Sequence, residues 1–250
     1  MIKRLVFFCI LVLVVQCGKK DLQSELSLSI PSVPDGETNT YRIMALNDSI
    51  GTYTTILEHT WIGEVPAFAL TLITHSTTGK VATLDSSFIY VSRNKLVPLS
   101  SFRFIRIGSV LTTTAANYGP GSVAVSTYRA GEEKQRLLPY TPKTFDNDEL
   151  TFLGRALRLE PNKPAKLTIL SPMGHPFGGS VREAEFSYGG NEMVTVPAGS
   201  FDCRKLVLKT GVSEVEMWYE KSGTKRLIRY RAPSTGITME LLPAHITKQF

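Results

Sequence analysis

Hydrophobic and polar residues alternate along most of the chain beyond residue 39. Such alternation is typical of β-strands that turn one face to a core and the other face to water. The alternating runs are short and are separated by Gly, Pro, Asn or Asp, which favours antiparallel strands joined by turns. They cover residues 40–46, 51–60, 66–75, 80–92, 96–107, 122–129, 165–170, 181–188, 201–209, 213–219, 225–231 and 236–242. We therefore expect one antiparallel β domain over residues 40–250, built as a single curved sheet or an incomplete β-barrel or roll.

One segment departs from this alternation. Three leucines there recur with helical spacing, namely Leu150, Leu153 and Leu157. Asp146 precedes them and Glu149 follows Asp146 by three residues, which is the spacing of a capping box at a helix start. Pro161 ends the pattern. The sequence predicts one short helix over residues 148–159, packed on a face of the sheet.

The outward positions of the last four expected strands alternate in charge. They are basic in residues 201–209, acidic in 213–219, basic again in 225–231 and acidic in 236–242. Opposite charges on neighbouring strands contribute about 0.2–1 kcal/mol per pair, and they favour one register. We interpret the basic residues of 225–231 as part of a solvated outer ladder, in preference to a phosphate-binding patch.

Composition narrows the class of protein. Hydrophobic residues make up 42% of the chain and charged residues 20%, which is the balance of an ordinary packed domain. Disordered, collagen-like and coiled-coil chains are excluded. The net charge of +6 lacks the dense cationic clusters of nucleic-acid-binding proteins, so we expect no nucleic-acid partner.

The N-terminus has the pattern of a secretory signal. Lys3 and Arg4 precede an apolar run over residues 5–15. As a helix this run would span about 16 Å, roughly half of the ~30 Å hydrocarbon core of a membrane. We expect residues 1–16 to be a signal peptide and the protein to be exported.

Cys17 closes the apolar run, and residues 14–17 resemble the lipobox of bacterial lipoproteins. Gln16 departs from that motif, which usually has Gly, Ala or Ser there. We expect Cys17 to be lipidated, with residues 17–39 as a polar tether. The alternative is an ordinary cysteine with cleavage slightly further on. Gly18 stands where enteric lipoproteins retained at the inner membrane have Asp, so the resemblance implies an outer-membrane lipoprotein facing the periplasm.

A longer stretch carries a family resemblance. Residues 194–206 read Val-Thr-Val-Pro-Ala-Gly-Ser-Phe-Asp-Cys-Arg-Lys-Leu and resemble the vPAGtFdcykl signature of an exported bacterial family, domain-of-unknown-function family 3108. Residues 218–220 and 227–230 resemble its next two strands, and the resemblance extends over residues 40–242. It implies an envelope β-protein akin to the incomplete-barrel carriers of lipoproteins. It brings no catalytic residues, since none are established for the family.

The motif has a physical reading of its own. Pro197 marks a strand end, because it cannot donate to a sheet ladder. Gly199 permits a turn conformation closed to other residues, so we interpret this segment as a hairpin corner. We expect the neighbouring Cys203 to be a buried thiol rather than a nucleophile.

The histidines suggest little chemistry. None of the four has the short spacing of a metal site, and we expect no metal and no cofactor. Glu58, His59 and His75 could meet on adjacent strands and bind a metal, although strand-end polar residues are the simpler interpretation. His175 lies in a stretch rich in Gly and Pro, which is either a functional loop or the tip of a long hairpin.

The sequence therefore favours a protein that is not an enzyme. It contains no nucleophile elbow, P-loop or dinucleotide fingerprint. A hydrolase would require His75 or His175 within about 3.2 Å of a carboxylate or hydroxyl in a cleft.

An excess of apolar residues favours a binding role. Bulky residues occupy both faces of residues 102–107, and a strand apolar on both faces must be covered on both or line a cavity. Our leading hypothesis is an envelope lipoprotein that binds or carries a hydrophobic ligand, such as a lipid or acyl chain, or an envelope polymer. The expected groove residues are Phe68, Leu70, Leu72, Phe102, Phe104, Leu150, Leu153 and Leu157. The alternatives are a filled core under the helix and a scaffolding lipoprotein that binds only other envelope proteins.

The lipid anchor has a direct test. Substitution Cys17→Ser removes the thiol that would be acylated, so the protein should leave the membrane fraction of the cell envelope. Fractionation followed by immunoblotting measures this, and unchanged membrane partitioning of the variant would refute the anchor.

Overall fold

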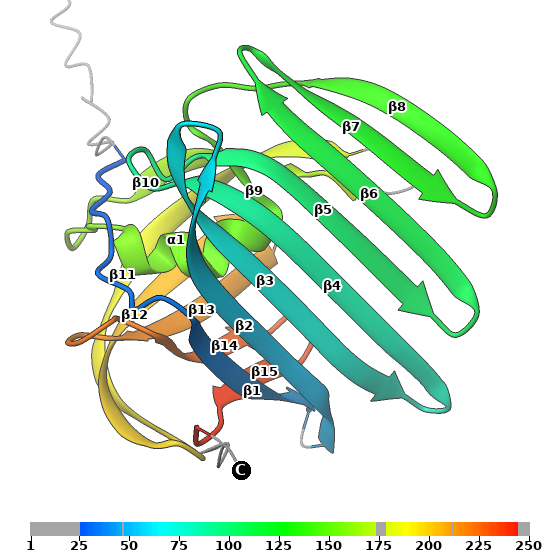
Figure 1. The fold of residues 1–250 in the computed structure, drawn as a ribbon. Coiled ribbons are helices and arrows are strands. Elements are labelled where there is room, and N and C mark those ends of the chain that lie inside the picture. Colours follow the sequence, from blue (N-terminus) through cyan, green and yellow to red (C-terminus); the bar gives the residue numbers. More distant parts are fainter. Residues whose placement is uncertain (1–25, 47, 174–178, 212, 245–250) are drawn as a thin grey trace, which may run out of the picture.

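The computed structural model describes residues 26–46, 48–173, 179–211 and 213–244 of the chain. Cys17, His175 and the expected signal peptide lie outside these described residues. Within them, 15 strands, one 3-10 turn and one short α-helix make up the fold (Figure 1). No helix of this described part is long and apolar enough to span a membrane.

The elements fall into two runs of strands separated by the helix. The first run is β1 (Glu37–Ala45), β2 (Asp48–Ile62), β3 (Val65–Thr78), β4 (Val81–Ser92), β5 (Pro98–Ile107), β6 (Val110–Gly119), β7 (Ser122–Arg129) and β8 (Glu132–Pro139). The connection contains β9 (Thr144–Asp146), the 3-10 turn η1 (Asn147–Glu149) and the helix α1 (Leu150–Ala156). The second run is β10 (Ala165–Ser171), β11 (Ser180–Val196), β12 (Gly199–Thr210), β13 (Ser213–Glu220), β14 (Leu227–Ala232) and β15 (Ile237–Leu241).

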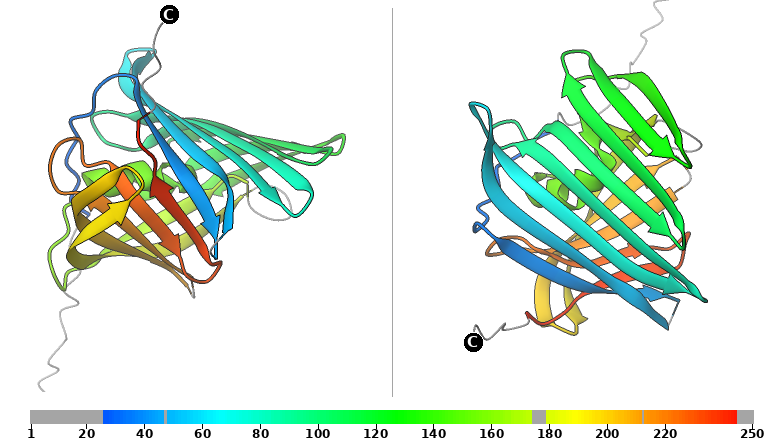
Figure 2. Two further views of the ribbon diagram at one scale, coloured as in Figure 1. Left: turned by 90° about the horizontal axis from the view of Figure 1, so that it is seen from below. Right: turned by 45° about the vertical axis from the view of Figure 1, so that its right-hand side comes forward.

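All the strands belong to one sheet, in the order β8-β7-β6-β5-β4-β3-β2-β1-β15-β14-β13-β12-β11-β10-β9. Neighbours are antiparallel except β9 and β10, which are parallel. The first and last strands pair with each other, so the two runs join through β1 and β15 (Figure 2). The sheet is open between its edges β8 and β9. The predicted fold class, a single curved antiparallel sheet with one short helix, is confirmed.

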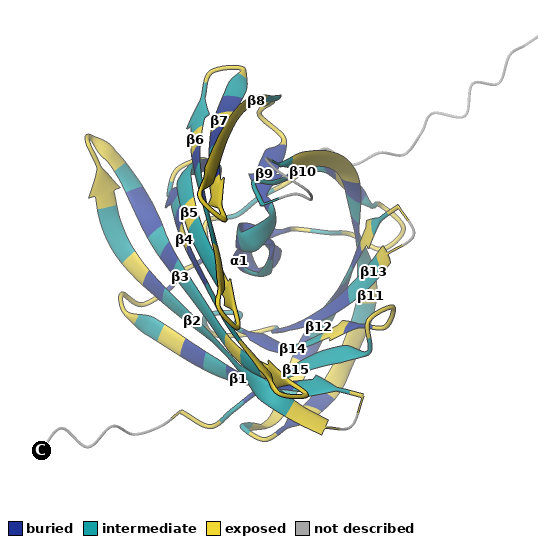
Figure 3. Ribbon diagram, turned by 90° about the vertical axis from the view of Figure 1, so that its right-hand side faces the viewer, coloured by how far each residue is buried: buried dark blue, intermediate teal, exposed yellow. Residues whose placement is uncertain are grey.

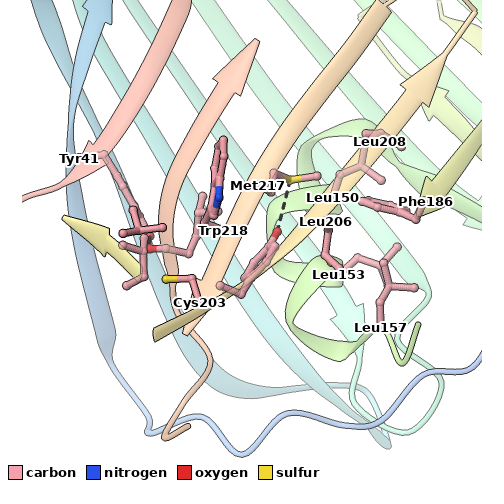
Figure 4. Packing of buried hydrophobic residues seen from close by; sticks show 14 of the residues in the cluster. Tyr41, Leu150, Leu153, Leu157, Phe186, Cys203, Leu206, Leu208, Met217 and Trp218 are labelled. Atoms are coloured by element: carbon pink, nitrogen blue, oxygen red, sulfur yellow. Dashed lines mark hydrogen bonds between the residues drawn. The ribbon is translucent and has the colours of Figure 1, made fainter. Parts of the chain in front are cut away.

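The sheet curls around α1 and packs its inner face against it (Figure 3). Leu150, Leu153 and Leu157 meet buried side chains of β11 to β13, among them Phe186 and Leu206 (Figure 4). Each fully buried side chain of this size contributes about 1.5–3 kcal/mol to folding. The alternating apolar positions therefore form strands whose shared inner face is covered by the helix.

The helix starts as the sequence predicts and ends earlier. Asp146 and Glu149 form the capping box. The side chain of Asp146 accepts a hydrogen bond from the backbone of Glu149, and the side chain of Glu149 accepts one from the backbone of Asp146. The predicted helix over residues 148–159 is observed as η1 and α1, which end at Ala156. Arg204 donates to the carbonyls of Leu157 and Gly154, at 2.8 and 3.2 Å, and so satisfies the last turn.

The chain before β1 lies against the C-terminal end of the helix. The backbone of Ser29 donates to Ala156 O at 2.8 Å, and that of Arg158 donates to Ser27 O at 2.9 Å. Val33 is buried, and β1 begins at Glu37. The expectation that residues 17–39 form a polar tether is therefore corrected for residues 27–39, which lie against the domain, with Val33 buried in a core cluster and Leu28 packed against that cluster.

The predicted charge ladder exists on the outer face of the second run of strands. Glu216 binds both Lys205 and Arg231, and Glu240 binds both Arg42 and Arg229. These pairs join β12, β13, β14, β15 and β1 in one register, as the alternation of charge predicts.

The ladder is less solvated than expected. The indole of Trp218 is nearly buried within it and donates to Glu192 Oε1 at 2.6 Å. Arg229 donates to Thr195 O at 2.6 Å, and Ala198 N donates to Leu241 O at 3.1 Å. The hairpin corner between β11 and β12 thus folds back across the ladder and covers part of it.

Gly154 makes the helix fit the sheet. A Cβ at this position would lie 2.1 Å from Oη and 2.4 Å from Cζ of Tyr219. Tyr219 is fully buried, and its hydroxyl donates to Thr151 O at 3.0 Å, so the ring has no room to move. Close approach of α1 to β13 therefore requires glycine.

Substitution Gly154→Ala should lower the free energy of unfolding by about 1–3 kcal/mol through overpacking. This loss opposes the gain of about 1 kcal/mol that alanine normally brings to a helix. Urea unfolding measures the change. Gly119→Ala is the matched control, because its Cβ would have only an ordinary contact at 3.6 Å with Ser122 O. Equal stability of the two variants would contradict the role of Gly154.

Candidate ligand-binding cavity

A cavity of about 450 Å³ lies on the concave side of the sheet, beside the first turn of α1. Strands from both runs line it, because the curl of the sheet brings them to face each other (Figure 3). Its lining residues are Ile43, Ile50, Tyr53, Leu72, Thr74, Ser76, Asp85, Ser87, Arg103, Asn147, Asp148, Leu150, Thr151, Arg182, Leu208, Thr210, Val215, Met217, Tyr230, Ile237 and Met239.

One side of the cavity, the apolar wall, comes mainly from the second run of strands. Its members are Ile43, Leu208, Val215, Met217, Ile237 and Met239. They share a face because each strand presents every second residue to the inside, and the register pairs Leu208 with Val215 and Ile43 with Met239. The two methionines give the wall adaptable side chains that can follow the shape of a ligand.

The opposite side, the polar wall, comes from β4, β5 and the helix start. Arg103 donates to both oxygens of Asp85, at 2.9 and 2.6 Å, and to Asp148 Oδ1 at 3.2 Å. Ser87 Oγ donates to Asp148 Oδ2 at 2.7 Å. Burial acts to lower the pKa of Arg103, but the hydrogen bond to Asp85 and the charge of Asp148 raise it overall, so the guanidinium stays charged.

Two buried carboxyls hold the helix start behind the polar wall. Tyr118 Oη donates to Asp146 Oδ2 at 2.6 Å, and Asp146 N donates to Glu149 Oε1 at 3.0 Å. Burial and the neighbouring Asp148 raise the pKa of Asp146 to about 6. Burial and the charge of Asp146 raise the pKa of Glu149 well above its usual value. Among the described residues, Glu149 Oε2 is buried and has no hydrogen-bond partner, which makes a negative charge on this carboxyl costly.

Two of the expected groove residues, Leu72 and Leu150, line the cavity. Phe68 and Leu70 also face inward, but they pack with Phe152 of the helix; the rings of Phe68 and Phe152 are 5.2 Å apart. Leu153 and Leu157 belong to the packed core on the other side of the helix. The helix fills this part of the hollow, so these four side chains are packed and do not line the cavity.

The expectation for Phe102 and Phe104 is corrected. Both alternate with Arg103, which points into the cavity, so both lie on the convex face of β5. Phe102 is 44% exposed and lies opposite Phe88, which is 40% exposed. The bulky residues on the two faces of β5 therefore have different surroundings: one face points to the inside of the sheet, and the other is partly exposed to solvent.

The sequence reasoning did not select the apolar wall or the polar wall as ligand-binding. Alternation along β13 and β15 places Val215, Met217 and Met239 on the inner face. No sequence signal shows which inner residues the helix leaves uncovered. The pairing of Arg103 with Asp85 and Asp148 joins residues far apart in the chain, and only the fold brings them together.

The candidate catalytic and metal residues lie elsewhere. His59 packs edge-to-face against Phe68, with ring centroids 5.4 Å apart, and neither His59 nor His75 lines the cavity. In the described part of the chain, no group of three or more His, Cys, Asp or Glu residues could hold a metal ion. Cys203 is fully buried, and burial raises the pKa of its thiol to about 11, so it is a poor nucleophile.

Fold and cavity together define an open, β-barrel-like protein with a cavity inside its curved sheet. The family model described as "Protein of unknown function (DUF3108)" matches residues 40–241, and the chain belongs to this family.

A solved structure shares the fold. It is the crystal structure of a beta-barrel-like protein of domain of unknown function DUF1849 from Brucella abortus, with a TM-score of 0.56 and 9% sequence identity. The similarity covers 87% of this chain and 98% of that one, and at this identity it shows the fold alone. No curated protein matches the chain.

The raised pKa values of Asp146 and Glu149 predict an unusual pH dependence of stability. Because the folded protein favours the neutral carboxyls, the folded state binds more protons than the unfolded state above the unfolded pKa values. The free energy of unfolding should therefore fall, by about 1–3 kcal/mol, as the pH rises from about 5 to about 7.5. Glu216 and Glu220 have lowered pKa values and lose their contribution at lower pH, below this window.

Substitution Glu149→Gln keeps the capping box and removes the charge. The variant should be more stable than the wild type at about pH 7.5 and less sensitive to pH. Urea unfolding at both pH values measures this. Glu183→Gln, at an exposed position of β11, serves as the control and should behave like the wild type. An unchanged pH profile in Glu149→Gln would contradict the prediction.

Proposed function

We propose that this protein is a non-enzymatic binding or carrier module of the bacterial envelope, and that it takes a hydrophobic ligand such as a lipid or acyl chain into the cavity. The observation that carries the proposal is the cavity of about 450 Å³ with one continuous apolar wall. Small-molecule sites commonly measure about 300–1,000 Å³ and combine mostly apolar walls with a few polar groups. A filled core would have favoured the scaffolding alternative.

The ionisable side chains in and near the cavity support a binding function in preference to catalysis. A general acid or base needs a proton-transfer group within reach of a substrate. In the cavity, Asp85 and Asp148 are engaged by Arg103, and the described histidines lie outside the lining. The buried carboxyls of Asp146 and Glu149 lie behind the polar wall and serve the capping box.

The place where the chain enters the domain suits an anchored carrier. Residues 27–29 pair with Ala156 and Arg158 at the C-terminal end of the helix. The cavity borders the opposite end, at Asn147 and Asp148. A lipid anchor at Cys17 would therefore attach the domain away from the cavity and leave the cavity accessible.

The scaffolding alternative has one observation in its favour. Phe88 and Phe102 form an exposed aromatic pair on the convex face. Exposed apolar residues that gather on one face can mark a protein interaction site. The two functions use opposite faces of the sheet, so substitutions can separate them.

The cavity-filling variant Val215→Trp tests the proposal. Val215 lies in the apolar wall, and an indole ring there would occupy ligand space. We expect binding of N-phenyl-1-naphthylamine, an uncharged apolar fluorophore, to weaken at least about tenfold, since each 1.4 kcal/mol of lost contact is tenfold in Kd. Fluorescence titration measures this.

Phe102→Trp is the matched control, because it enlarges an exposed side chain on the convex face. It should bind the fluorophore like the wild type. Absence of binding by the wild type, or equal binding by Val215→Trp, would refute the proposed function. Native mass spectrometry of protein extracted gently from the envelope should then show a co-purified lipid in the wild type and less of it in Val215→Trp.

A further inference from the structure

The polar and apolar residues that line the cavity lie on opposite sides of it. Met217 and Met239 belong to the apolar wall, and Asp85, Arg103 and Asp148 belong to the polar wall. A purely hydrocarbon ligand would leave without partners those acceptor sites of Asp85 and Asp148 that their protein donors do not use, which is unfavourable for partly buried polar groups. The lining therefore fits a ligand with both an apolar body and a polar part.

The charges of the lining cancel. Its charged side chains are Asp85, Asp148, Arg103 and Arg182, two negative and two positive. The group formed by Arg103 with its two carboxylates has one net negative charge, and Arg182 offsets it. Arg182 is exposed and donates to Asn147 Oδ1 at 2.9 Å.

Arg103 is already occupied within this group. Its Nε and one terminal nitrogen donate to Asp85, and the other terminal nitrogen donates to Asp148. A carboxylate or phosphate head at the remaining N–H donors of Arg103 would lie beside Asp85 and Asp148, whose negative charges repel it. A cationic head would lie beside the positive charges of Arg103 and Arg182, which repel it. Both kinds of charged head are disfavoured.

Uncharged hydrogen-bonding groups fit without displacing anything. Carboxylate oxygens accept several hydrogen bonds, so Asp85 and Asp148 can accept more than those they receive from Arg103, Ser87 and Asn147. Hydroxyls of Thr74 and Ser76 also line the cavity and can both donate and accept. A hydroxyl-bearing head, which also donates and accepts, matches this wall.

We propose that the ligand is an amphiphile with an uncharged, hydroxyl-bearing head. The head binds at the Asp85–Arg103–Asp148 group, and the chain lies against Met217 and Met239. This inference rests on the proposed binding function, because it assigns the chemical class of ligand to the same cavity.

Three probes of equal chain length test the head group. They are monolauroylglycerol, laurate and dodecyltrimethylammonium, which are neutral, anionic and cationic. Each is titrated below its critical micelle concentration against the full-length protein loaded with N-phenyl-1-naphthylamine. We expect the neutral glycerol ester to displace the fluorophore at a concentration at least about tenfold lower than either charged probe.

The outcomes separate the two proposals. Equal or stronger displacement by laurate or by the cationic probe would overturn the inference about the head group and leave the binding function standing. Failure of the fluorophore to bind, or displacement by none of the probes, would overturn both.

The variant Asp148→Asn links the preference to the polar wall. It keeps the size of the side chain and leaves the cavity lining as a whole, Arg182 included, with one net positive charge, so the preference should shift toward laurate by about tenfold. Glu58→Gln makes the same change in net charge at an exposed position of β2 and should leave the preference unchanged. If Asp148→Asn folds poorly by circular dichroism, Asp85→Asn makes the same charge change from strand β4 instead of the helix start. An unchanged preference in a folded aspartate variant would overturn the inference.

Discussion

The concave face of the sheet must be covered, and the rest of the structure depends on how one short helix covers it. A helix of seven residues is too short to be stable alone, so its position depends on tertiary contacts. The capping box holds its start, and Arg204 takes up its last carbonyls. In the last turn, Arg155 forms a buried ion pair with Glu37 at 2.8 Å and donates to Thr224 O. These contacts tie the helix to both runs of strands.

The cavity follows from the size of this helix. Seven residues cover about 10 Å of the hollow at 1.5 Å per residue, which is far less than the length of the inner strands. Phe152 and Leu153 fill the part under the helix, and the remainder stays open beside its first turn. The polar wall lies there because Asp148 belongs to the helix start, and Asp85 and Arg103 lie on the strands that face it.

Much of the fold was predictable because it depends on local patterns. Alternation of apolar and polar residues predicted the strands, and the spacing of Asp146 and Glu149 predicted the helix start. The charge ladder predicted the register of the last strands, since opposite charges attract across neighbours. The prediction of the groove residues is less accurate. Apolar character alone places Phe102 and Phe104 in the groove, but an apolar side chain can point either inward or outward.

The sequence alone determined the class of fold, the helix start and the order of charges on the outer ladder, because each depends on residues close in the chain or on adjacent strands. Only the tertiary structure decided which inner residues are packed and which line a cavity. That outcome depends on where the helix sits, which contacts from Arg155, Arg204 and Tyr219 decide across long sequence separations. The tertiary structure also decided that Arg103 of β5, beside Asp85 on the neighbouring strand β4, meets Asp148 as well, because the sheet curls around the helix start.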